Sequence, residues 1–303
     1  MNSPLRAVVS ALGIGVVVAT LWTPNVTFAA SRATIEETRG QAAAQSTRAT
    51  KPAKKTKKVA RRTAAPSTPV RSASISFDVA ANGFSFANWS DLGPSDDATL
   101  ATLRRLFDDS SVCATVDEGT CTPFAAATTF LARLNVELTK GHCEGLTLAA
   151  YSYFAASRTG VSGLSIDEVL ADVNYFASTQ VLPNAARQTR TSRAEDLAVI
   201  AERLLADLTR GGGATLGLHE ETRAHTVLPI GIQIVGSRAT ITVYDSNTPG
   251  RAQVVNLDLS ANTWTYTPTS ADGTVTDSWS GTKNLSVVDL AARASVSTAA
   301  LRS

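Results

Sequence analysis

Apolar positions recur at helical spacing through the first half of the chain and alternate with polar positions through the second half. Apolar residues three or four apart predict helices over residues 98–107, 123–138, 144–154, 166–176 and 193–208. After three consecutive glycines, alternating β-branched residues predict strands over residues 214–218, 225–235, 239–244, 252–259 and 263–267. Because the helices precede the strands rather than alternate with them, the pattern predicts an α+β domain.

The N-terminal residues 1–29 have the pattern of a secretory signal peptide. Arg6 precedes an uncharged apolar stretch over residues 7–22, and small residues follow at positions 27 and 29. The alternative is an uncleaved N-terminal anchor. No later segment of the sequence is long and apolar enough to cross a membrane, so we expect no further transmembrane span. The sequence therefore predicts a product that is secreted or associated with the cell envelope.

Residues 30–74 differ in composition from the rest of the chain. They are rich in Ala, Thr, Ser, Pro and basic residues, which predicts a disordered linker before one domain over residues 75–303. Residues 32–71 hold 11 Lys or Arg against two Glu, so the net charge of +2 hides an acidic domain. The linker is either a solvated spacer or a contact for an anionic cell-wall polymer or membrane surface. We expect no nucleic-acid partner, because the linker has no aromatic residue to stack on bases.

The chain contains three cysteines, and their positions suggest two roles. Cys113 and Cys121 are close enough to form a disulfide across a short loop. Cys143 is then an odd thiol in an oxidising compartment, at the start of a predicted helix whose dipole favours a thiolate. We therefore expect Cys143 to be a nucleophile, and a buried, inert cysteine is the alternative.

Three histidines are available as a base for this thiol. His142 adjoins Cys143, and neighbouring side chains at a helix start point apart. His219 is expected in a solvent-exposed charged loop. His225 opens a predicted strand, and a turn near residue 236 would bring the chain back so that Asp245 lies opposite His225. A carboxylate there would orient the imidazole, with Asn247 as the alternative orienting residue.

A helix-opening Gly-x-Cys-x-Gly at residues 141–145, the strand-opening His225 and Tyr-Asp-x-Asn-x-Pro-Gly at residues 244–250 resemble the papain-like cysteine peptidase superfamily. The sequence looks closest to a little-characterised bacterial branch, in which a Gly-Phe-x-Phe-x-Asn segment often precedes the cysteine, as at residues 83–88 here. The resemblance implies that Cys143 is the nucleophile, His225 the general base and acid, and Asp245 the orienting residue. It also implies a fold in which the nucleophile helix of an N-terminal helical part packs on a C-terminal antiparallel sheet or half-barrel.

The sequence departs from this superfamily at the expected oxyanion donor. Papain-type enzymes have a Gln six residues before the cysteine, where this chain has Glu137, a poor donor when ionised. Asn88 is the candidate donor in its place, and its alternative role is to cap the next loop. Trp279 lies in a motif similar to the Asn-Ser-Trp-Gly of papain itself, but its distance from His225 predicts a role in core packing.

The resemblance implies a secreted thiol hydrolase that cleaves peptide or amide bonds in a peptide or protein substrate through a Cys-His-Asp triad. Two alternatives remain open. A transglutaminase-like acyl transferase shares the order of the three residues, and a non-catalytic wall-associated protein would depend on its basic linker instead. We expect no cofactor. We also expect no metal site, because three scattered histidines and one free thiol form no ligand cluster.

Overall fold

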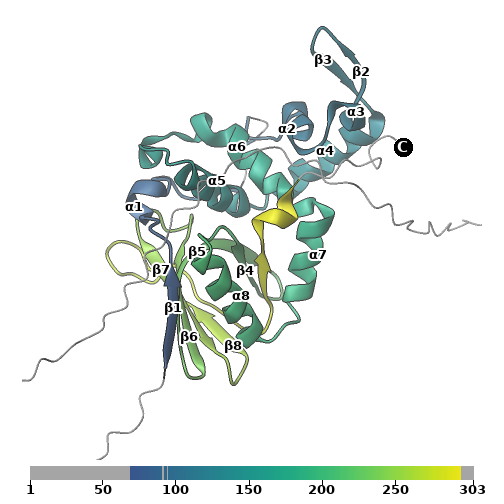
Figure 1. Ribbon diagram of the computed structural model, residues 1–303. Helices are drawn as coiled ribbons and strands as arrows, with labels where there is room; N and C mark the ends of the chain where they lie inside the picture. Colours follow the sequence, from purple (N-terminus) through teal and green to yellow (C-terminus); the bar gives the residue numbers. More distant parts are fainter. Residues whose placement is uncertain (1–68, 91, 94, 295–303) are drawn as a thin grey trace, which may run out of the picture.

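The computed structural model describes residues 69–90, 92–93 and 95–294, and in these a helical part covers a curled antiparallel sheet (Figure 1). The mixed α+β architecture and the half-barrel curl agree with the fold class expected from the sequence. The predicted signal peptide and nearly all of the predicted linker lie outside the described residues. None of the helices described is long and apolar enough to span a membrane.

The predicted linker boundary at residue 74 is wrong, because the described fold begins earlier. Residues Val70–Ser74 form strand β1, which pairs antiparallel with residues 231–235 of β5. Only five residues make the strand, and most of their side chains are exposed. Backbone hydrogen bonds to β5 therefore hold it, together with Ala73, which packs against the core beneath the sheet. Composition alone could not reveal this pairing.

Eight strands form the main sheet of the described region, and all their pairings are antiparallel. The order across it is β10-β4-β5-β6-β7-β8-β9, with β1 on β5. Besides β1, these are β4 (Thr215–His219), β5 (Ala224–Val235), β6 (Arg238–Tyr244), β7 (Ala252–Asp258), β8 (Thr263–Tyr266), β9 (Trp279–Thr282) and β10 (Leu285–Val288).

Strand β5 organises the sheet because it is long enough to pair with three neighbours. Its first residues pair with β4, its last residues pair with β1, and β6 runs along its other side. The register with β6 shifts between Pro229 and Gly231, where the proline has no N–H to donate. Strand β5 is therefore irregular at this point. His225 is its second residue and so lies near one end of the strand.

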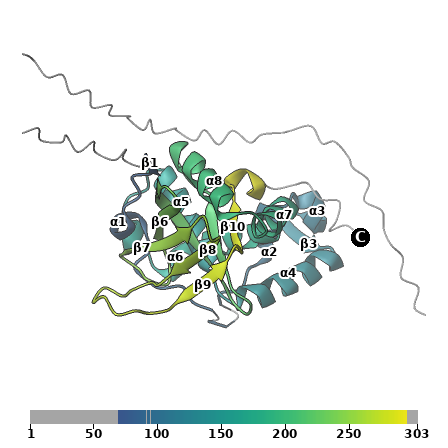
Figure 2. The same cartoon turned by 90° about the horizontal axis from the view of Figure 1, so that it is seen from below.

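The helices pack against the sheet (Figures 1 and 2), while alternate residues of β7 and β8 are exposed on its other face. The longer ones are α2 (Leu100–Leu106), α4 (Ala125–Leu138), α5 (Cys143–Ala155), α6 (Ile166–Ser178), α7 (Pro183–Ser192) and α8 (Leu197–Thr209). Short turns are α1 (Val79–Asn82), α3 (Asp109–Val112), η1 (Val161–Gly163), η2 (Thr179–Val181) and η3 (Leu290–Arg293). Leu197, Ile200 and Leu204 of α8 pack into the core cluster of the sheet. Leu146, Ala149 and Ala150 of α5 pack with Leu228 and Ile230 in a separate cluster.

A third apolar cluster joins the outer helices and contains the predicted disulfide. Cys113 and Cys121 are bonded, with their Cα atoms 5.3 Å apart. The bond links β2 (Cys113–Asp117) and β3 (Thr120–Pro123), which form a hairpin that projects from the helical part in Figure 1. Both sulfur-bearing residues pack with Leu103, Leu106 and Phe107 of the cluster, so the disulfide attaches the hairpin to the helices.

Candidate active site

Cys143 is the first residue of α5, and the loop before it is held by a distant side chain. The Asn88 side-chain oxygen Oδ1 accepts a hydrogen bond of 2.8 Å from the backbone N–H of His142. Gly141 turns the chain with φ +138°, a conformation that disfavours other residues. Cys143 is half-buried and is the free cysteine of the chain, since the other two form the disulfide. Its thiol therefore sits at a defined helix N-terminus and still has access to solvent.

The glycine that follows the thiol has a packing role. A Cβ atom at Gly145 would lie 2.2 Å from the backbone carbonyl oxygen of Val173 in α6. Only a glycine allows α5 and α6 to approach this closely at the start of α5. The Gly-x-Cys-x-Gly motif thus combines a turn before the thiol with a tight helix crossing after it.

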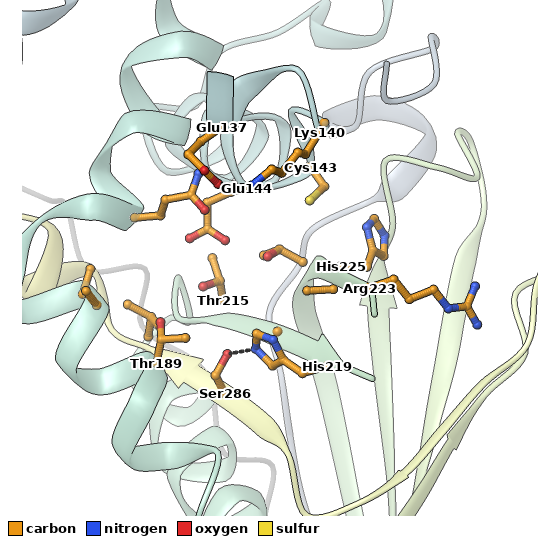
Figure 3. A pocket seen from close by; sticks show the side chains of 18 of the residues that line it. Glu137, Lys140, Cys143, Glu144, Thr189, Thr215, His219, Arg223, His225 and Ser286 are labelled. Carbon is orange, nitrogen blue, oxygen red and sulfur yellow. Dashed lines mark hydrogen bonds and ion pairs between the residues drawn. The ribbon is translucent and has the colours of Figure 1, made fainter. Parts of the chain in front are cut away.

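His225 and Asp245 meet as the hairpin predicted. The His225 ring nitrogen Nε2 lies 2.7 Å from the Asp245 oxygen Oδ1, at the ends of β5 and β6. Both side chains are buried, His225 being 4% exposed and Asp245 fully enclosed. The Cys143 thiol lies beside the His225 ring (Figure 3), close enough to contribute to the raised pKa of His225. Since Nε2 binds the carboxylate, Nδ1 is the ring nitrogen left for the thiol.

The surroundings of this imidazole favour its charged form. Burial disfavours the imidazolium, but the charge and hydrogen bond of Asp245 outweigh burial, and Cys143 adds to their effect. Together they raise the pKa of His225 to about 10. The pKa of Asp245 is lowered, because His225, the Tyr266 hydroxyl and the Asn247 amide outweigh its burial. The pair therefore behaves as a buried ion pair beside the thiol.

Both oxygens of the Asp245 carboxylate accept hydrogen bonds. These bonds show which of Asp245 and Asn247 contacts the imidazole. The Asn247 backbone N–H, not its side chain, donates to Asp245 Oδ1 at 2.8 Å. The hydroxyl of Tyr266 in β8 donates to the other oxygen, Oδ2. The residue that contacts the imidazole is thus Asp245, with Asn247 as a support. Tyr266 carries no sequence signal beyond its place in an alternating strand, so the sequence did not reveal it.

Asn88 connects the two halves of the site. Its backbone N–H donates to the carbonyl of Ser246 at 2.9 Å, while its side-chain Oδ1 accepts from His142. This bonding fixes the orientation of the amide and leaves Nδ2 as the donor, close to Gly141. Asn88 therefore does fix a loop, and its remaining donor lies beside Gly141, two residues before Cys143.

Two other polar residues near Cys143 have structural partners. Glu137, on α4, forms an exposed ion pair with Lys140 at 2.6 Å. The His142 ring is buried and stacks on the Trp89 ring, with centroids 4.6 Å apart, and its Nδ1 lies 3.2 Å from the Trp89 carbonyl. His142 therefore packs against Trp89, behind the loop that precedes Cys143.

Trp279 lies closer to the site than the sequence predicted. It is buried in the core as expected, but its ring centroid is only 6.1 Å from that of His225. On the exposed side the Arg223 guanidinium stacks over the indole at 3.7 Å. Arg223 in turn bonds Glu220 and Asp277. The indole and guanidinium therefore cover one side of the imidazole, which helps explain why His225 is buried.

A pocket of about 620 Å³ opens from Cys143 and His225 toward α7 and β10. In Figure 3 the thiol and His225 lie together on one side, while His219 and Ser286 lie hydrogen-bonded at the far end. Between them lies Glu144, which pairs with the buried Arg293. His219 was expected in an exposed loop, but it ends strand β4 and is half-buried in the pocket wall. The sequence predicted a loop at His219 because charged residues follow this histidine.

In the described part of the chain, no group of three or more His, Cys, Asp or Glu side chains is arranged to hold a metal ion. The comparisons with known proteins gave no relative on which to base an assignment. No protein-family model, no curated protein and no solved structure matches this chain. The chemistry of the site must therefore be argued from its own geometry.

Proposed function

We propose that this chain is a thiol-dependent hydrolase that cleaves a peptide or amide bond through Cys143, His225 and Asp245. The observation that supports the proposal is the position of His225, held between a buried carboxylate and the half-buried thiol of Cys143. A buried base that is oriented by a carboxylate and in contact with a nucleophile is the arrangement that acyl transfer requires. A cysteine kept only for packing would need no such partner.

The proposed reaction has two stages. The Cys143 thiolate attacks the substrate carbonyl carbon and forms a C–S bond, and the imidazolium of His225 then gives its proton to the leaving nitrogen as the C–N bond breaks. In the second stage His225 takes a proton from water, and the resulting hydroxide attacks the thioester carbonyl, so that a C–O bond forms, the C–S bond breaks and Cys143 leaves as a thiolate. The acid product leaves, and the Cys143 thiolate again lies beside the His225 imidazolium.

Two donors are available for the oxyanion of this reaction. The Cys143 backbone N–H belongs to the first turn of α5, where amides have no acceptor within the helix. The second donor is Asn88 Nδ2, because Oδ1 of the same amide is already bonded to His142. With Asn88 as the second donor, the site needs no oxyanion donor at position 137, where Glu137 cannot donate when ionised.

Alkylation of the purified protein with iodoacetamide tests the proposal directly, because Cys143 is the one cysteine outside the disulfide. We expect the wild type to react faster than His225→Ala at pH 6, since the raised pKa of His225 keeps the imidazolium beside the thiol. His225→Ala should react slowly at pH 6 and faster as the pH rises, as an ordinary thiol does. Cys143→Ser should not react. Equal pH profiles for wild type and His225→Ala would refute the proposal.

A second assay separates thiol activation from catalysis. Acylation by p-nitrophenyl acetate passes through an oxyanion, whereas alkylation does not. Asn88→Asp keeps the acceptor for the His142 N–H and removes the donor, so we expect a loss of about 10²-fold in acylation with a much smaller change in alkylation. Equal losses in both assays would exclude Asn88 as the oxyanion donor.

A further inference from the structure

The end of the pocket beyond Cys143 is built from polar groups that the proposed triad does not use. Alternate residues of β4, Thr215 and His219, face the pocket, while Leu216 and Leu218 between them lie in the sheet core. Ser286 of β10 completes this floor, with its Oγ 2.8 Å from His219 Nε2. Glu144 forms the side nearest the thiol (Figure 3). A buried polar surface of this kind needs an explanation, since burial of polar groups in a cavity does not by itself stabilise a fold.

The fold makes specific room for the His219–Ser286 pair. Gly217 lies between Thr215 and His219 on the same face of β4 and opposite Ser286 in the strand register. A Cβ atom at Gly217 would lie 2.3 Å from Ser286 Oγ and 2.8 Å from His219 Nε2. The α7 side of the pocket is lined by Ala185 and Ala186, which also leave space. Small residues thus keep this end of the pocket open and keep its polar atoms together.

The carboxylate beside this floor, that of Glu144, is already paired. The Glu144 carboxylate is paired with the Arg293 guanidinium, and Arg293 also donates to Thr179 and to Thr215, at 3.0 and 2.8 Å. Burial, with a contribution from the charge of Arg193, lowers the pKa of His219 to about 4, so its ring is neutral near pH 7. On the floor of the pocket a charged ligand group would therefore lose its hydration and meet only neutral groups and a carboxylate that is already paired, while Arg190 lies on the α7 side of the pocket.

We propose that this end of the pocket, formed by Thr215, His219, Ser286 and Glu144, is a specificity subsite for an uncharged carboxamide side chain of the substrate. The subsite offers hydroxyl and imidazole groups that both donate and accept, beside a carboxylate that accepts, and a carboxamide has both donors and an acceptor. An aliphatic side chain would use none of the remaining donor and acceptor positions of these groups, and its apolar contacts would be limited to Val288 and small residues. The inference rests on the proposed function, because it concerns the substrate of that same site.

The subsite can be tested with four electrophilic dipeptide probes that differ only in the side chain next to the reactive group: Gln, Glu, Lys or Leu. The rate of Cys143 modification by each probe is measured by intact-mass spectrometry and divided by the iodoacetamide rate of the same protein. We expect the Gln probe to react at least about tenfold faster than each of the others, the effect of one or two hydrogen bonds made only by the carboxamide. A Leu, Glu or Lys probe that reacts as fast as the Gln probe would overturn the proposal.

Ser286→Ala provides the second readout. It removes a hydroxyl from the subsite, so the preference for Gln over Leu should fall several-fold. Ser280→Ala, on β9 and outside the pocket, is the matched control and should leave the preference unchanged. An unchanged preference in Ser286→Ala would also overturn the proposal. The ranking of probes on the wild type does not depend on any variant folding. If the proposed triad is wrong, the iodoacetamide rate will be the same in the wild type and in His225→Ala. That outcome is distinct from a failure of the subsite.

Discussion

Tyr266 donates its hydroxyl to the one oxygen of Asp245 that His225 does not use. The two residues lie on different strands, and both are almost completely buried. The Asp245 carboxylate is therefore fixed by three donors from three positions in the chain. The orientation of the imidazole thus depends on β8 as well as on the β5–β6 hairpin, and this dependence can be measured.

Tyr266→Phe should destabilise the protein by about 1–3 kcal/mol, because it leaves a buried carboxylate oxygen without its donor. Urea denaturation measures the change in the free energy of unfolding. The pH profile of Cys143 alkylation should also change, since a less firmly held Asp245 orients His225 less well. Tyr175→Phe is the control, because Tyr175 is half-buried and packs under Arg105 through its ring. Equal effects of the two substitutions would argue against a positioning role for Tyr266.

The ion pair of His225 and Asp245 should make stability depend on pH in a defined direction. The pKa of His225 is raised in the folded state, so its contribution is complete below the unfolded value of about 6.5 and is lost as the pH rises toward 10. The pKa of Asp245 is lowered, so its contribution is lost only in acid, below about pH 4.

This dependence can be isolated in a Cys143→Ser background, in which the thiol no longer titrates. Urea denaturation of that protein and of its His225→Gln derivative at pH 5, 7.5 and 9.5 gives the contribution of the pair. We expect the difference in the free energy of unfolding to be largest at pH 5 and to shrink toward pH 9.5. A difference that grows with pH would contradict the assignment of a buried ion pair.

Arg293→Met should destabilise the protein by about 3–5 kcal/mol, because it leaves the Glu144 carboxylate buried and unpaired. Adding Glu144→Gln should recover much of this loss, and a double-mutant cycle measures the coupling. Arg71→Met is a control, since it breaks an exposed pair with Glu202 and should have a much smaller effect. Additive effects at Arg293 and Glu144 would contradict a coupled buried pair.

Gly145→Ala should destabilise the protein by about 1–3 kcal/mol, because the added methyl group collides with the backbone of α6. It should also slow Cys143 alkylation at pH 6, since the first turn of α5 has to move. At Gly163 a Cβ would meet nothing within 4 Å, so Gly163→Ala is the control for thermal unfolding and alkylation. The role of Gly145 in helix packing would be refuted by a Gly145→Ala variant with wild-type melting and alkylation.

The sequence predicted the structural features that depend on residues close together in the chain. Helix α5 and the β5–β6 hairpin follow from local periodicity, and the hairpin register then brings His225 to Asp245. Strands β9 and β10 were missed because neither has the alternating pattern of β8: Trp279 is the one large apolar residue of β9, and β10 is buried along its whole length. Helix α7 was missed because its sequence is strongly polar.

The polar contacts around the site were not predictable for a different reason. Tyr266 reaches Asp245, and Arg293 reaches Glu144, only after distant strands and turns have packed. No spacing in the chain encodes such a meeting. His219 shows the same limit, since the charged residues after it predicted a loop, whereas pairing with β10 places it in a pocket wall.

The bonds of Asn88 to His142 and to Ser246 have a consequence for how the site forms during synthesis of the chain. A nascent chain that ends before β6 already contains the thiol at residue 143, but it lacks the partner that fixes the other end of the Asn88 segment. The Asp245 carboxylate, in turn, has its full set of donors only once β8 has been made. Contacts so distant in sequence form late in folding. The arrangement around His225 and Asp245 is therefore complete only after residue 266 of β8 has been made.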